Sequence, residues 1–217
     1  MKPQVLITRD SQLGSGFKAL LEKNHCEVIC ESFIETKTVD LQKAPPGDWV
    51  FFSSPRAVKH YFEIFKPDQN QRYAALSTGT AEQLKKYASC DFEGKKTSEE
   101  SVKAFSRLLK EDETVVIPRS DKSVRRLQCV LKPDQYTEFI LYLTLPALKK
   151  LPRKPEIAVF TSPLNVVAYA QSGNLFPAKT VAIGETTAEE LLKKGLKPLV
   201  SKGYTPNDLA GAVKQFL

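Results

Sequence analysis

The chain has 217 residues, of which 41% are hydrophobic and 26% are charged, so it is long enough for two small domains with apolar cores. No stretch approaches the roughly 20 apolar residues of a membrane span, and no secretory signal is present, so we expect a cytoplasmic protein without a membrane partner. The net charge of +7 favours an anionic partner.

Apolar runs rich in Val, Ile and Phe alternate along the chain with segments of helical pattern. The runs predict strands at residues 4–8, 27–29, 50–52, 73–76, 114–118, 139–145, 158–160 and 180–183. Helices are predicted over residues 15–24 and 123–131, and after start signals at Ser54, Thr97, Ser162, Thr186 and Thr205. Pro55 and Pro163 suit the first helical position. This alternation predicts parallel α/β sheets.

Two segments repeat at about half the chain length. Phe-Ser-Ser-Pro, which ends at Pro55, returns as Phe-Thr-Ser-Pro, which ends at Pro163, 108 residues later. The segment around Thr80 returns around Thr187, 107 residues later. Two ordered matches at nearly one separation indicate two copies of one α/β unit.

Serine and threonine follow the predicted strands in both copies. The carboxyl ends of parallel strands, where helix N-termini present free N–H groups, are where such sheets bind anions. Capping explains any single turn, but four turns in a repeated arrangement make an anion-binding cleft equally plausible. No glycine-rich nucleotide-binding motif is present.

Cysteine and histidine offer little for metal or cofactor chemistry. The spacing of the four cysteines does not suit a zinc site, and we expect reduced core residues. With only His25 and His60, catalysis has to proceed without a histidine-centred apparatus. The basic residues form no clustered stripe and no known motif, so nucleic-acid binding rests on charge alone and is the least favoured alternative.

Several of these pieces together resemble the uroporphyrinogen-III synthase family over nearly the whole chain. They are Val5-Leu6-Ile7-Thr8-Arg9, Phe52-Ser53-Ser54-Pro55-Arg56-Ala57-Val58, Thr80-Ala81, Tyr142, Phe160-Thr161-Ser162-Pro163, Ala182-Ile183-Gly184, Thr186-Thr187-Ala188 and Tyr204-Thr205-Pro206. Ser77 stands where the family usually has glycine.

The resemblance implies an α/β fold of two flavodoxin-like parallel-sheet lobes. The first lobe would be discontinuous, comprising residues 1–33 and 147–217. The second would comprise residues 45–136. Two connecting strands would join them, at 34–44 and 137–146.

The resemblance also implies an activity. The family cyclises hydroxymethylbilane, a polycarboxylate linear tetrapyrrole, with inversion of ring D, in tetrapyrrole (haem) biosynthesis. This is a lyase (hydro-lyase) reaction without a cofactor or metal. We expect a monomer acting on a small-molecule substrate. The alternative is a catalytically inactive binding or regulatory module of the same fold.

By similarity, Tyr142 matches the tyrosine thought to help the substrate hydroxyl leave. The residues alone would favour a half-buried strand tyrosine instead. Thr186 and Thr187 match the paired threonines of the family, and Lys179 matches a lysine of some members. Arg9 suits a carboxylate partner, although a surface ion pair is equally plausible. The full set of expected substrate-binding residues is Arg9, Ser53, Ser54, Ser77, Thr78, Thr80, Thr161, Ser162, Lys179, Gly184, Thr186 and Thr187.

Overall fold

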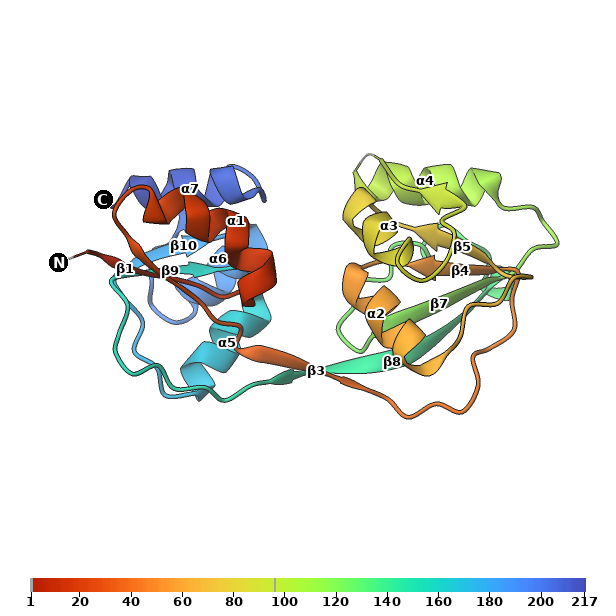
Figure 1. The fold of residues 1–217 in the computed structure, drawn as a ribbon, viewed down its shortest axis with the longest axis horizontal. Helices are drawn as coiled ribbons and strands as arrows, with labels where there is room; N and C mark the ends of the chain where they lie inside the picture. Colours follow the sequence, from red (N-terminus) through yellow and green to blue (C-terminus); the bar gives the residue numbers. More distant parts are fainter. Residues whose placement is uncertain (1, 96) are drawn as a thin grey trace. The chain divides into compact units, whose positions relative to one another are not determined.

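The computed structural model describes residues 2–95 and 97–217, with their side chains except those of residues 12 and 13 (Figure 1). The chain divides into two compact units. Unit 1 comprises Met1–Glu35 and Leu145–Leu217, and unit 2 comprises Thr36–Thr144. Unit 1 is therefore built from both ends of the sequence, whereas unit 2 is continuous.

Unit 1 contains a five-stranded parallel sheet with helices on both faces. The strands lie in the order β11 (Leu199–Val200), β10 (Lys179–Ala182), β9 (Ile157–Phe160), β1 (Gln4–Ile7) and β2 (Glu27–Cys30). The helices are α1 (Ser11–Glu22), α5 (Pro163–Gln171), α6 (Glu185–Leu192) and α7 (Pro206–Lys214). α1 and α7 cover one face of the sheet, and α5 and α6 cover the other (Figure 1). Apolar side chains of each pair belong to the core cluster on that face. The central strands are continuous apolar runs because both of their faces are buried.

Unit 2 contains a six-stranded sheet. Its order is β3 (Ile34–Thr38), β8 (Tyr136–Pro146), β7 (Val115–Ser120), β4 (Trp49–Phe52), β5 (Arg72–Ala75) and β6 (Phe92–Glu93), and the pairs from β8 to β6 are parallel. The helices are α2 (Pro55–Ile64), α3 (Thr78–Leu84) and α4 (Ser98–Leu108), with a 3₁₀ turn at Pro133–Gln135. α2 and α3 cover one face, and α4 covers the other.

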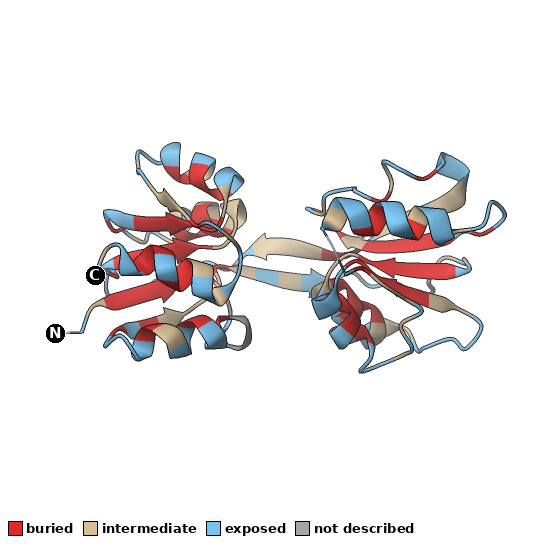
Figure 2. Cartoon of the chain, turned by 90° about the horizontal axis from the view of Figure 1, so that it is seen from above, coloured by how far each residue is buried: buried red, intermediate tan, exposed pale blue. Residues whose placement is uncertain are grey.

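Burial in both units follows these layers. The central strands β1, β4 and β9 are buried, whereas β3 and most of β8 are half-buried or exposed, and the helices carry both buried and exposed residues (Figure 2). In unit 2, for example, the ring of Phe105 on α4 lies 5.3 Å from Trp49 and 4.8 Å from Phe51, measured between ring centroids. Burial of such large side chains is the main favourable contribution to folding.

The two sheets have the same spatial order once the repeat is aligned. The repeat matches β4, β5 and β6 with β9, β10 and β11, so β7 and β8 occupy the places of β1 and β2. Along the sequence, β1 and β2 are the first strands of unit 1, whereas β7 and β8 are the last strands of unit 2. The helix starts agree with this alignment: Ser54 and Ser162 cap α2 and α5, as predicted, and Thr97 and Thr205, 108 residues apart, form capping boxes on α4 and α7.

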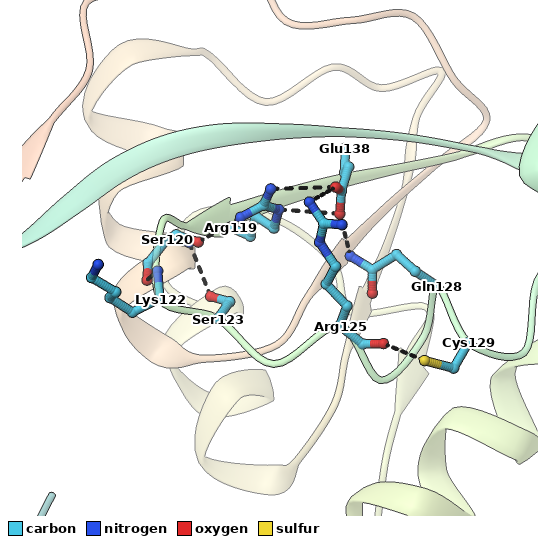
Figure 3. A network of polar contacts seen from close by, with 8 residues as sticks. All are labelled: Arg119, Ser120, Lys122, Ser123, Arg125, Gln128, Cys129 and Glu138. Atoms are coloured by element: carbon cyan, nitrogen blue, oxygen red, sulfur yellow. Dashed lines mark hydrogen bonds and ion pairs between the residues drawn. The ribbon is translucent and has the colours of Figure 1, made fainter. Parts of the chain in front are cut away.

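The helix predicted over residues 123–131 is wrong, because this segment consists of turns. Local side-chain bonds hold its start: Ser120 N–H donates to Ser123 Oγ at 3.0 Å, and Lys122 N–H donates to Ser120 Oγ at 2.9 Å (Figure 3). Such bonds compete with helix formation. Leu127 and Leu131 still cover the sheet face beside α4.

The second predicted connecting strand, 137–146, agrees with β8, but the first, 34–44, is longer than the strand observed. Only Ile34–Thr38 of the segment 34–44 is a strand, and both β3 and β8 belong to the sheet of unit 2. In the described part of the chain, no helix is long and apolar enough to cross a membrane.

A buried carboxylate joins the amino ends of β4 and β5. Glu113 accepts hydrogen bonds from Trp49 Nε1 at 3.1 Å and from the backbone N–H of Lys110 at 3.2 Å, and forms an ion pair with Arg72 at 2.9 Å. The Arg72 guanidinium also lies 4.3 Å from the centroid of the Trp49 ring. Burial by itself would raise the pKa of Glu113, but these hydrogen bonds and the Arg72 charge hold the pKa below its ordinary value.

We predict that Glu113→Gln lowers the free energy of unfolding of unit 2 by about 1–3 kcal/mol, because Arg72 loses its ion pair. The contribution of Glu113 is present above the ordinary pKa of 4.5 and is lost as the pH falls through the lower folded-state value. Urea unfolding at pH 7 and at pH 3.5 measures it, with the exposed Glu111→Gln as the control. An equal loss of stability at both pH values would contradict the prediction.

Candidate functional site

In unit 2, the predicted hydroxyl groups meet at one edge of the sheet. Ser53 and Ser54 follow β4, and Ser77, Thr78 and Thr80 follow β5. Phe52 and Ala75, the last residues of these strands, are paired in parallel register. The structure therefore brings both groups to the carboxyl edge, where α2 and α3 begin.

Ser54 has two contacts at this edge. Its Oγ accepts the N–H of Ala57 at 3.2 Å, which caps α2, and lies 3.5 Å from the hydroxyl oxygen of Tyr142. Because the Ser54 oxygen accepts the Ala57 N–H, its own hydrogen can be donated to Tyr142. The Tyr142 O–H can then be donated to a further acceptor.

Tyr142 is the predicted catalytic residue and lies on β8 with only 6% of its surface exposed. Its ring stacks on the imidazole of His60 from α2, with centroids 4.5 Å apart and planes 22° apart. No local sequence pattern links His60 directly with Tyr142. The sequence pattern that could have indicated a partner for His60 is Thr36-x-Thr38 in the connecting strand, because alternation along a strand places both hydroxyls on one face.

The second turn of unit 2 is arranged differently. Ser77 stands at the N-cap of α3 but makes no side-chain bond to the helix backbone. Its Oγ lies 3.0 Å from Oγ1 of Thr80, which is fully buried. Thr78 is exposed. The N-terminus of α3 is therefore not capped by a side chain.

In unit 1, the equivalent turns follow β9 and β10. Thr161 is fixed to the end of β1: its N–H donates to Thr8 Oγ1 at 2.9 Å, and its hydroxyl donates to the Thr8 carbonyl at 2.7 Å. Ser162 caps α5 by accepting from the N–H of Asn165 at 3.2 Å. Both hydroxyls are therefore engaged in holding the fold together.

The turn after β10 resembles the one after β5. The residue at the N-cap of α6 is Gly184, so the start signal predicted at Thr186 is wrong and no side chain caps this helix. Thr187 is buried, whereas Thr186 is exposed. The Tyr204 ring lies over Gly184, since a Cβ there would be 3.4 Å from Tyr204 Cε1.

The two basic residues of the predicted set lie at opposite ends of the unit 1 sheet. Arg9 follows β1 and is half-buried at the carboxyl edge. Lys179 is the first residue of β10, pairs in register with Ile157 at the start of β9, and donates from Nζ to the Phe216 carbonyl at 2.7 Å. The structure therefore does not bring Lys179 together with Gly184 and the threonines.

An ion-pair network lies beside the site of unit 2 and joins β7 and the segment that follows it to β8 (Figure 3). Glu138 on β8 is bound by Arg119 Nε at 3.1 Å, Arg125 Nη2 at 2.7 Å and Gln128 Nε2 at 2.7 Å. Burial would raise the pKa of Glu138, but Gln128 and the two guanidinium groups lower it. The adjoining cavity, which Ser53 and Arg119 help to line, measures about 20 Å³ and has room for about one water molecule.

Neither the cysteines nor any carboxylate cluster offers a metal site in residues 2–95 and 97–217. All four cysteines are free thiols: Cys26 is buried, Cys30 and Cys90 are half-buried and Cys129 is exposed. Burial raises the pKa of the Cys26 thiol, which keeps it protonated and unreactive. Cys129 is not the core residue that we expected.

Comparison with known proteins identifies what the chain resembles. Residues 15–211 match the family model described as uroporphyrinogen-III synthase HemD. A curated protein of Methanocaldococcus jannaschii, provisionally named a uroporphyrinogen-III synthase, is 29% identical over 93% of this chain and 94% of its own length.

Two solved structures share the fold. The uroporphyrinogen-III synthetase of Helicobacter pylori superposes with a TM-score of 0.73 at 19% identity, over 100% of both chains. A mutant uroporphyrinogen III synthase of Thermus thermophilus gives 0.54 at 19% identity, over 99% of this chain and 97% of that one.

We predict that Ser54→Ala lowers the free energy of unfolding of unit 2 by about 1 kcal/mol, because α2 loses its N-cap. Trp49 is the only tryptophan of the chain and lies in unit 2, so its fluorescence during urea unfolding reports this unit. Ser162→Ala removes the matching cap in unit 1 and should leave the Trp49 transition in place. If both variants shifted that transition equally, the effect could not be assigned to the cap of α2.

Proposed function

Because the chain belongs to the uroporphyrinogen-III synthase family, we propose that it converts hydroxymethylbilane into uroporphyrinogen III, as a cyclising hydro-lyase of haem biosynthesis. The substrate hydroxyl leaves with a proton as water. Ring D is attacked at its substituted carbon, the resulting spiro intermediate fragments, and the macrocycle recloses with ring D inverted. The ring proton lost on reclosure balances the one that leaves with the hydroxyl.

The structural observation that carries the proposal is the position of the Tyr142 hydroxyl. It lies beside the N-cap of α2, at the edge where the hydroxyls of unit 2 meet, and when Ser54 donates in their contact the Tyr142 proton is left for another acceptor. A phenol in this position can donate a hydrogen bond or a proton to a departing oxygen. The helix N-terminus favours the negative charge of substrate carboxylates nearby.

The uncapped helices α3 and α6 support a second part of the proposal. They follow equivalent strands in the repeat, and both lack a side-chain cap, while α2, α4, α5 and α7 are capped by serine or threonine. We assign the free N–H groups of α3 and α6, with the exposed Thr186, to substrate carboxylates, whereas the Thr78 side chain already bonds to Glu93. Lys179 has no part in this assignment, because it lies at the other end of β10.

The cyclisation needs little covalent chemistry from the protein, because hydroxymethylbilane closes by itself to the symmetric type I isomer. The protein has to hold the conformation in which ring D inverts. The proposal therefore assumes a single chain in the cytoplasm, without a cofactor, and the remaining expected residues Arg9, Ser53, Ser77, Thr80, Thr161 and Ser162 would shape the site.

The experiment that tests the function supplies the protein with freshly prepared hydroxymethylbilane and separates the oxidised product isomers. An excess of type III isomer supports the proposed reaction. Type I isomer alone, at the rate seen without protein, would favour the alternative of an inactive binding module.

We predict that Tyr142→Phe lowers turnover by about 10²-fold or less while the product stays type III. General acid assistance contributes about 10²–10⁴-fold, and this hydroxyl leaves readily without help. Tyr136→Phe, at the other end of the same strand, is the matched control and should keep wild-type turnover. Type I product from Tyr142→Phe would mean that the phenol shapes the substrate and does not act as an acid.

We predict that Thr186→Val and Thr187→Val act on different properties, although the residues are adjacent. Thr186 is exposed at the N-terminus of α6, so its loss should lower turnover and leave the thermal unfolding midpoint unchanged. Thr187 is 1% exposed, so its replacement should change mainly the unfolding midpoint. A lower turnover from Thr187→Val alone would reverse the assignment.

A further inference from the structure

His60 and Tyr142 are buried inside unit 2 with their rings stacked. Their side chains come from α2 and β8, and the residues are 7% and 6% exposed. With centroids 4.5 Å apart and planes 22° apart, the imidazole covers one face of the phenol ring. The phenol cannot tilt toward α2 without displacing the imidazole, so the orientation of the Tyr142 ring depends on the orientation of His60.

The imidazole is held at both nitrogen atoms by threonines of β3. Thr38 Oγ1 lies 2.8 Å from Nδ1, and Thr36 Oγ1 lies 2.8 Å from Nε2. Two hydrogen bonds at opposite sides of the ring fix its rotation about the side-chain bonds.

The neighbouring carboxylate determines which nitrogen carries the proton. Thr38 Oγ1 donates to Glu63 Oε2 at 3.3 Å, so this hydroxyl accepts from Nδ1–H of His60. Nε2 then has no hydrogen and accepts from the Thr36 hydroxyl. The arrangement satisfies a neutral ring, in which Nδ1 donates to Thr38 and Nε2 accepts from Thr36.

The charges around His60 are few. On α2 they are Glu63, whose Oε2 is 3.3 Å from Nδ1, together with Lys59 and Arg56. The charged residues of β3, Glu35 and Lys37, alternate with the threonines and lie on the opposite face, and β8 contributes the uncharged Tyr142. Burial lowers the pKa of His60 below its ordinary 6.5, although Glu63 opposes this.

We propose that His60 is a positioning residue for the Tyr142 hydroxyl: fixed by Thr36 and Thr38, the neutral imidazole holds the phenol ring in the orientation that directs its O–H to substrate. This role rests on the function proposed above. The neutral ring prevails above the ordinary pKa of histidine, and the arrangement is lost as the pH falls through the lower folded-state value.

A double-mutant cycle on turnover tests the role, with His60→Leu, Tyr142→Phe and the pair. We expect His60→Leu to lower kcat on the order of tenfold with little change in KM, and by no more than Tyr142→Phe does. In the Tyr142→Phe background, His60→Leu should cost nothing further, because the oxygen it positions is absent. Losses that multiply would overturn the proposal, since a merely structural histidine would act independently of that oxygen.

His60→Phe is a second variant, which keeps the test decisive if His60→Leu does not fold. It keeps a ring against Tyr142 but loses both threonine bonds, so we expect a smaller loss of kcat than in His60→Leu. The acid limb of the wild-type kcat profile should disappear in His60→Phe and remain in His25→Asn, the exposed-histidine control. An unchanged acid limb in His60→Phe would count against the proposal.

NMR of protein labelled with ¹³C-tyrosine gives a readout that needs no substrate. The Tyr142 ring signal, identified by its disappearance in Tyr142→Phe, should shift in His60→Leu and should move with pH in the wild type as His60 titrates. If the Tyr142 signal stays in place both in His60→Leu and across the pH titration of the wild type, the stacking role is overturned. If the wild type yields only type I isomer, the proposed function fails, and this NMR experiment still decides whether His60 fixes the ring.

Discussion

Parallel pairing of buried strands is the constraint on which each unit depends. Because every strand in a parallel run points the same way, the chain returns through a helix, and the helix N-termini gather at one edge. The free N–H groups at that edge need partners. Ser54 and Ser162 satisfy them in α2 and α5, whereas no side chain does so in α3 and α6. The sheet thus produces both the capped helices that stabilise the fold and the uncapped ones that can receive carboxylates.

The position of Tyr142 follows from the same constraint. β8 lies beside β7 and β3 in unit 2, so Tyr142 contacts α2 twice: its hydroxyl lies near Ser54 at the N-cap, and its ring stacks on His60 of the same helix. The equivalent strand of unit 1, β2, ends at Cys30 and carries no tyrosine. The repeat therefore supplies similar helix ends in both units, while the phenol occurs on this strand in unit 2 alone.

Local patterns predicted much of the fold. Ser-Pro pairs marked the starts of α2 and α5 because capping depends on residues within one turn. Contacts between distant residues were out of reach of such patterns. Thr161 was predicted to bind substrate, but it bonds instead to Thr8, which is 153 residues away in the sequence. The segment after Ser120 reads as a helix, but Arg125 on it bonds with Glu138 on β8, and its side chains bond to the local backbone.

The division of unit 1 between the two ends of the chain has a consequence for synthesis on the ribosome. Unit 2 is complete once Thr144 has emerged, so it can fold while translation continues. β1 emerges first, but one of its two neighbours in the sheet, β9, begins only at Ile157. Until then β1 can pair only with β2, and its other edge stays open while more than half of the chain is made. During that interval the nascent protein carries a complete unit 2 and an apolar strand with one unpaired edge, which is the kind of segment that chaperones bind.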